Sequence, residues 1–106
     1  MASQPYGPGP GNAVMELTGR FDRDSAPQIR KDFLKLAQNG SVKQLEINFS
    51  KAYCADTSCL AVMVEVLKAM RSRGGELRLK GLDDNTVRMI SLSRLDDIFS
   101  SIIAQE

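Results

Sequence analysis

The sequence predicts an α/β fold in which a small mixed β-sheet has helices packed on one face. Three short segments alternate apolar and polar residues with period two, as strands do when one face is buried. Helical segments separate them, and strand-helix-strand connections favour parallel pairing. Strands covered on both faces would be nearly continuously apolar, so the alternation indicates that helices cover one face only.

The three expected strands are residues 14–18, 44–49 and 76–80. In each of them the polar positions carry mainly Glu, Gln, Asn, Arg and Lys. The apolar positions form the face that the helices should cover. These positions are Met15 and Leu17, then Leu45, Ile47 and Phe49, then Leu77 and Leu79.

The first expected helix begins near Asp24 or Ser25, with Pro27 in its first turn, and runs to Gly40. Apolar residues recur along it at helical spacing. They are Ile29, Phe33, Leu36 and Ala37.

The second expected helix runs from about residue 58 to 73, and it is apolar over more than one face. Either both faces pack within the domain, or part of the helix docks a partner. A third helix should begin near Asp84 or Asn85, and a short element over residues 95–103 closes the chain.

Composition excludes several kinds of chemistry. The 106 residues include 14 Lys and Arg, 13 Asp and Glu, and no His, so an imidazole base and His metal ligands are absent. A net charge of +1 provides no broad field for nucleic acid or an anionic membrane. We therefore expect a protein that is not an enzyme, needs no cofactor or metal and does not bind nucleic acid directly. No run approaches the ~18 apolar residues that a membrane span needs, so we expect none.

Residues 1–12 contain three of the four prolines and no charged side chain, which predicts a flexible Pro/Gly tail before a single domain at 13–106. This tail does not have the basic and apolar regions of a secretion signal. Together with only two cysteines, it favours a reducing, cytoplasmic setting.

The two cysteines, Cys54 and Cys59, flank the expected start of the second helix. They could form a redox pair or present a thiolate activated by the helix dipole. Their spacing is not that of thioredoxin-type motifs, and no His is present to act as a base. The favoured interpretation is that both are buried small apolar side chains.

Between them lie Asp56, Thr57 and Ser58, three small polar residues where a strand leads into a helix. Such residues cap helices, because their oxygens accept the unpaired backbone N–H groups of the first turn. A hydroxyl here would also hold a phosphate at the positive end of the helix dipole. Beside Asp56, that phosphate would create a concentrated negative patch.

The segment Asp56-Thr57-Ser58-Cys59-Leu60 resembles the Asp-Ser-Ser-Gly-Leu signature of STAS domains, the fold of anti-sigma factor antagonists. Other segments that are similar to the family extend over most of the chain. They are Leu17-Thr18-Gly19-Arg20-Phe21-Asp22 with Ala26-Pro27-Gln28-Ile29-Arg30, Leu45-Glu46-Ile47-Asn48-Phe49-Ser50, Arg73-Gly74-Gly75-Glu76-Leu77-Arg78-Leu79 and Leu95-Asp96-Asp97-Ile98-Phe99.

The resemblance implies a regulatory module that binds an anti-sigma factor with serine-threonine kinase activity and is switched by phosphorylation. Thr57 occupies the phosphoacceptor position, with Ser58 as the secondary candidate. The other implied partner-binding residues surround it. They are Asp22, Asp56, Ser58, Cys59 and Val62.

Two other roles remain open on the resemblance. The chain is similar to the STAS subunit of a bacterial ABC-type lipid transport complex in having Asp-Thr at this site, and its partner would then be the ATPase subunit. The other open role is that of a component of a stress-signalling scaffold. The chain departs from the commoner pattern with Thr57 in place of Ser, Cys59 in place of Gly, and Cys54 and Ala55 in place of larger apolar residues.

Overall fold

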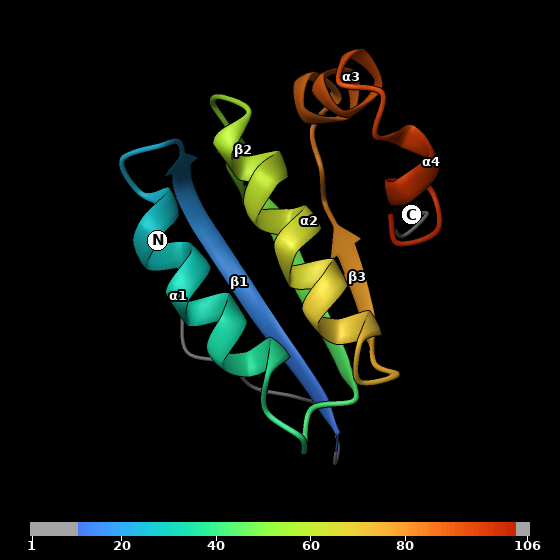
Figure 1. Ribbon diagram of the computed structural model, residues 1–106. Coiled ribbons are helices and arrows are strands. Elements are labelled where there is room, and N and C mark those ends of the chain that lie inside the picture. The colour runs from blue at the N-terminus through green and yellow to red at the C-terminus, as the bar shows by residue number, and fades with distance from the viewer. Residues whose placement is uncertain (1–10, 104–106) are drawn as a thin grey trace.

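The computed structural model describes residues 11–103. Figure 1 shows helices α1 and α2 side by side over one face of a sheet, with α3 beyond the carboxyl end of strand β3 and α4 to the side of that strand. The predicted α/β fold with helices against one face is therefore confirmed. The elements in chain order are β1 (Asn12–Phe21), α1 (Ala26–Ala37), β2 (Gln44–Cys54), α2 (Ser58–Arg71), β3 (Glu76–Lys80), α3 (Asp84–Leu92) and α4 (Asp96–Phe99).

The sheet has the strand order β1-β2-β3, so β2 is central. Both strand pairs are parallel, and an isolated bridge between Leu79 and Ile103 is parallel as well. The sheet was predicted to be mixed, and over the described residues it is parallel throughout. The reason is that a helix follows β1 and β2 and returns the chain to the end where the strand began.

Strands β1 and β2 continue well beyond their predicted ends. Glu16 pairs with Asn48, but the next pair is Thr18 with Lys51, so β2 carries one extra residue at this point. Such a bulge interrupts the period-two alternation on which the prediction depended. Beyond it the ladder resumes and reaches the pair Phe21 and Cys54.

The core lies between the sheet and the two long helices. The predicted apolar positions of the strands are all buried, as are Ile29, Phe33 and Ala37 of α1. Helix α2 buries a wider face, which includes Val62 and Val66. Most of its apolar surface is thus packed within the domain. This agrees with the first interpretation of the sequence, in which both faces of the helix pack internally. The remaining buried residues of α2 are Cys59, Leu60, Met63, Leu67 and Met70.

Two arginines connect segments that are distant in sequence. Arg73 follows the end of α2, where its Nε donates to the carbonyl of Ala37 at 2.6 Å and its Nη2 donates to that of Val42 at 2.7 Å. It therefore ties the α2–β3 turn to the loop after α1. On the outer surface, Arg30 of α1 forms an ion pair with Glu65 of α2, which lowers the pKa of that carboxyl through the Arg30 hydrogen bond.

The predicted tail over residues 1–12 lies outside the described residues except at its last two positions. There the boundary differs, because Asn12 already belongs to β1, and the Gly11 carbonyl accepts the N–H groups of Lys43 and Gln44. Among the described residues, the helices are too short or too polar to cross a membrane.

We predict that Gly81→Ala destabilises the fold more than Gly74→Ala does. Gly81 and Gly74 both have positive φ, +75° and +74°. Backbone strain in either alanine variant should therefore lower the free energy of unfolding by about 1 to 2 kcal/mol. At Gly81 the new Cβ would also lie 2.8 Å from the backbone nitrogen of Ser50, whereas at Gly74 nothing lies within 4 Å. Urea unfolding of both variants should show an additional loss of about 1 kcal/mol or more for Gly81→Ala; equal losses would contradict the close contact.

Candidate functional site

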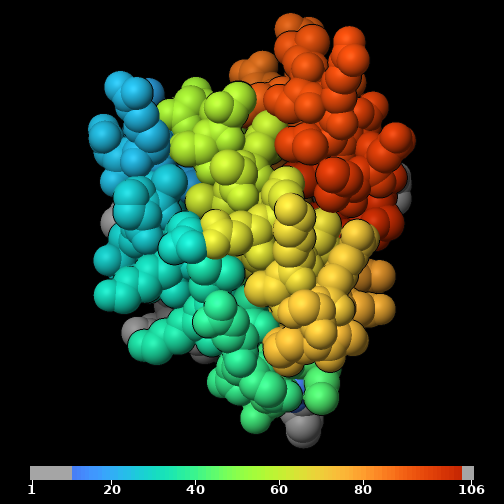
Figure 2. Space-filling model, in the orientation of Figure 1, coloured from blue at the N-terminus to red at the C-terminus, as the bar shows by residue number. Residues whose placement is uncertain are grey.

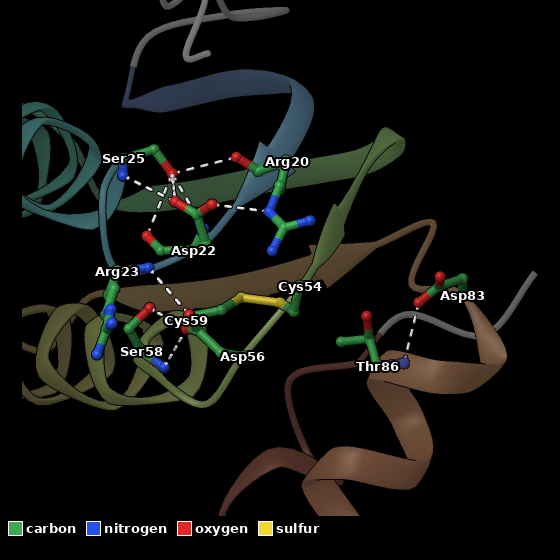
Figure 3. The surroundings of a disulfide bond; sticks show 10 residues. All are labelled: Arg20, Asp22, Arg23, Ser25, Cys54, Asp56, Ser58, Cys59, Asp83 and Thr86. Atoms are coloured by element: carbon green, nitrogen blue, oxygen red, sulfur yellow. Dashed lines mark hydrogen bonds and ion pairs between the residues drawn. A yellow bond between two sulfur atoms is a disulfide. The ribbon is translucent and has the colours of Figure 1, made fainter.

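The candidate site forms where β1 and β2 end side by side. Because the strands are parallel, their carboxyl ends meet at one edge of the sheet, and the Ala55 N–H extends the ladder by donating to the Phe21 carbonyl at 2.8 Å. The loops that follow these strands are therefore neighbours. Figure 3 shows that they bring together Asp22, Arg23, Asp56 and Ser58.

Asp22 organises the loop before α1. Its Oδ1 accepts the N–H groups of Asp24 and Ser25, each at 3.0 Å, and its Oδ2 accepts Arg20 Nε at 2.7 Å. The Ser25 N–H and then the Arg20 guanidinium lower the pKa of this carboxyl. Ser25 stands at the N-cap position as predicted, but its hydroxyl makes no capping bond; it donates to the Arg20 carbonyl at 3.1 Å instead.

Asp56 connects the two loops and also starts α2. Its Oδ1 accepts the Ser58 N–H at 2.9 Å and the Ser58 hydroxyl, while its Oδ2 accepts the Arg23 N–H at 3.1 Å. The Ser58 hydroxyl and then the Ser58 N–H lower its pKa, although the charge of Asp22 works in the opposite direction. Both carboxyls are consequently ionised at neutral pH, and the Arg20 guanidinium balances the charge of Asp22.

Thr57 occupies the N-cap position of α2, yet its side chain makes no capping hydrogen bond. Asp56 accepts the N–H of Ser58, the first residue of the helix. The Thr57 side chain is exposed and borders a shallow hollow of about 350 Å³. The hollow is lined by Arg23, Asp56, Thr57, Ser58 and Ala61.

In the space-filling view, the surface at the start of α2 lies between the β1–α1 loop and α3 (Figure 2). Of the residues predicted from the sequence, Asp22, Asp56, Thr57 and Ser58 come together here. Cys59 and Val62 do not reach this surface, because they are 0% and 5% exposed and pack in the core.

Two residues of the hollow, Arg23 and Ala61, were missed. Ala61 could have been found from helix periodicity, since it lies one turn after Thr57 on the same face. Arg23 gave no sequence signal, because the fold brings it from a loop 33 positions away from Asp56.

The cysteines were expected to be buried small apolar side chains, with a redox pair as the open alternative, and the structure combines features of both. Both are buried, but the structure joins Cys54 and Cys59 in a disulfide with a Cα–Cα distance of 5.6 Å (Figure 3). The first turn of α2 carries Cys59 back over the end of β2, which the linear spacing does not reveal. Among the described residues, no three His, Cys, Asp or Glu side chains are grouped to hold a metal ion.

Comparison with known proteins agrees with this geometry. The family model described as "Mlab, STAS domain" matches residues 9–103. The chain therefore belongs to the STAS domain family, as its sequence motifs implied.

Two relatives are named anti-sigma-B factor antagonists. The Bacillus subtilis protein is 30% identical over 79% of this chain and 75% of its own length. The Listeria monocytogenes protein is 32% identical over 77% of this chain and 71% of its own length.

Solved structures of the Bacillus protein SpoIIAA share the fold at 17% identity. The unphosphorylated anti-sigma factor antagonist gives a TM-score of 0.79 over 97% of this chain and 86% of that one. The phosphorylated form gives a TM-score of 0.75 over 97% of this chain and 89% of that one.

We predict that the free energy of unfolding falls with acid in a way that depends on Asp56. Its pKa and that of Asp22 are lowered in the folded chain. Their stabilisation is therefore present above the pKa of the unfolded chain and is lost as the pH falls through the lower folded value. In urea unfolding at several pH values, Asp56→Asn should reduce this dependence. Asp24→Asn, the same change at an exposed position of the neighbouring loop, is the control; an equal effect of both variants would contradict the assignment.

Proposed function

We propose that this chain is a regulatory binding module that docks an anti-sigma factor and is released when that factor, acting as a kinase, phosphorylates Thr57. The observation that carries the proposal is the exposed Thr57 side chain. It makes no capping hydrogen bond at the start of α2 and lies beside an ionised Asp56. The anti-sigma-B antagonists that resemble the chain support the choice of partner.

In the unphosphorylated state, the partner packs against the hollow and the adjoining first turn of α2. Transfer of a phosphoryl group from ATP to the Thr57 hydroxyl adds about 1.5 to 2 negative charges there. The ionised Asp56 lies next to Thr57, while the charge of Asp22 is balanced by Arg20. The additional repulsion and the cost of removing water from the phosphate then prevent close packing with the partner.

The replacement of the family's Gly by Cys59 does not obstruct this surface. The Cys59 side chain is 0% exposed and faces the core, so it occupies no space beside Thr57. The small Ala61 side chain lies one helical turn further on and borders the same hollow. A kinase therefore has room to approach the hydroxyl. The module contributes only this surface, and the catalytic groups belong to the kinase. We place both proteins in the cytoplasm.

We predict that incubation with the cognate anti-sigma kinase and ATP adds one phosphate at Thr57, which peptide mass spectrometry would locate. Thr57→Ala should abolish the addition and leave partner binding within about threefold, since a surface truncation costs little. Thr57→Asp should weaken binding by about tenfold or more, because its charge imitates part of the phosphate. Ser58→Ala is the matched control and should still be phosphorylated. Absence of phosphate from both Thr57 and Ser58, or equal effects of Thr57→Ala and Thr57→Asp, would contradict the proposal.

A second candidate uses the same surface without a switch. The Asp56-Thr57 pair resembles that of STAS subunits in ABC-type lipid transport complexes, in which the helix after Thr57 would dock the ATPase subunit constitutively.

For this candidate we predict that the chain co-purifies with an ABC ATPase subunit from its own organism. Thr57→Asp should then reduce recovery of the complex about as much as a bulky neutral change such as Thr57→Gln, because the contact would be steric. A selective loss with Thr57→Asp would favour the phosphorylation switch instead.

A further inference from the structure

We propose that the Cys54–Cys59 disulfide is a redox switch that sets the order of the Asp56-Thr57-Ser58 loop. Its oxidised form holds the loop in the arrangement described above, and its reduction loosens the first turn of α2. The effect on a partner rests on the proposed function, whereas the effect on the loop does not.

The position of the disulfide carries the inference. Cys54 is the last residue of β2 and Cys59 is the second residue of α2. Only four residues lie between them, and three of these are Asp56, Thr57 and Ser58. The covalent link thus closes the loop that holds the candidate site, and Figure 3 shows it directly beside Asp56 and Ser58.

Packing determines which part of the loop responds to reduction. Two thiol sulfurs in non-bonded contact need more separation than two bonded sulfurs. Cys54 and Cys59 are 5% and 0% exposed, so neither sulfur can move apart by turning into bulk solvent. Cys54 is fixed by pairing with Phe21, and the next residue, Ala55, donates its N–H to the Phe21 carbonyl. The start of α2 is therefore the side that must shift.

This shift acts on the contacts that define the site. Asp56 accepts hydrogen bonds from Ser58 and from the Arg23 N–H, and both depend on the position of the first turn relative to the strand ends. In the oxidised chain, the disulfide and these hydrogen bonds restrain the same four-residue loop. In the reduced chain only the hydrogen bonds remain, so a partner or kinase must order the loop when it binds.

The chemistry is thiol-disulfide exchange with a dithiol. One thiolate of the dithiol attacks a sulfur of the disulfide once the first turn of α2 opens, which gives a mixed disulfide. The second thiol of the reagent displaces the protein sulfur and leaves as a cyclic or intramolecular disulfide. Cys54 and Cys59 together gain two electrons and two protons, which the dithiol loses. A disulfide oxidant such as oxidised glutathione reverses the reaction.

A switch fits this chain better than a purely structural staple. The domain has an extensive apolar core that includes residues from all three strands and both long helices, whereas disulfides are typical staples of small secreted domains with insufficient cores. The sequence leads us to expect a reducing compartment, where disulfides are usually transient or redox-sensing.

The first test needs no partner. The mass of the chain purified without reductant should show the loss of two hydrogens, and treatment with dithiothreitol should restore them. Amide hydrogen exchange over residues 55–61 should then become faster by about threefold or more on reduction, while β3 remains unchanged. The double variant Cys54→Ala/Cys59→Ala should exchange like the reduced chain with or without dithiothreitol. Failure to form the disulfide, or equal exchange in the oxidised and reduced chains, would overturn the proposal.

The second test measures the consequence for the site. The kinase that labels Thr57 should phosphorylate the oxidised chain faster than the reduced chain, by about threefold to tenfold, because less ordering is required. The double variant should show the slower rate under both conditions. Equal rates would overturn the regulatory half of the inference. If no labelling occurs at all, the proposed function fails instead, and hydrogen exchange alone decides whether the loop responds to reduction.

Discussion

The parallel pairing of β1 with β2 is the constraint on which the candidate site depends. It sets Phe21 opposite Cys54 and allows the Ala55 N–H to bond the Phe21 carbonyl. An antiparallel pair would place the ends of these strands at opposite edges of the sheet. Because the pair is parallel, the loop before α1 and the loop before α2 open at the same edge, where one side chain can reach both of them.

Asp56 is that side chain, and it also lies next to the exposed Thr57. A helix start has unpaired N–H groups, and a polar residue must accept at least one of them. Here Asp56 accepts the Ser58 N–H through one oxygen and the Arg23 N–H through the other. Thr57 stands at the N-cap position, and its side chain makes no capping hydrogen bond. The carboxylate that links the two loops thus lies beside a hydroxyl that is exposed.

The sequence predicted the elements of the fold well because local signals specify them. Period-two alternation identified all three strands, and apolar spacing identified the helices. The family motifs brought Asp22, Asp56, Thr57 and Ser58 to one site. What the sequence did not reveal depends on contacts between distant segments or on local three-dimensional geometry. The bulge hid the true ends of β1 and β2, and Arg23 joins the site only through tertiary packing. The pairing of the cysteines follows from the direction in which α2 leaves the strand.

The balance of charge at the site indicates that phosphorylation of Thr57 would change partner binding more than the stability of the fold. Within the chain, a phosphate on this residue would meet the positive end of the α2 dipole, and Arg23 borders the same hollow. These groups offset the repulsion from Asp56 and Asp22, so the fold itself should tolerate the modification. A docked partner would cover the hollow and remove the water that solvates the phosphate and both carboxylates. The cost of the added charge therefore falls mainly on the interface, which is the requirement for a switch that releases a partner without unfolding the module.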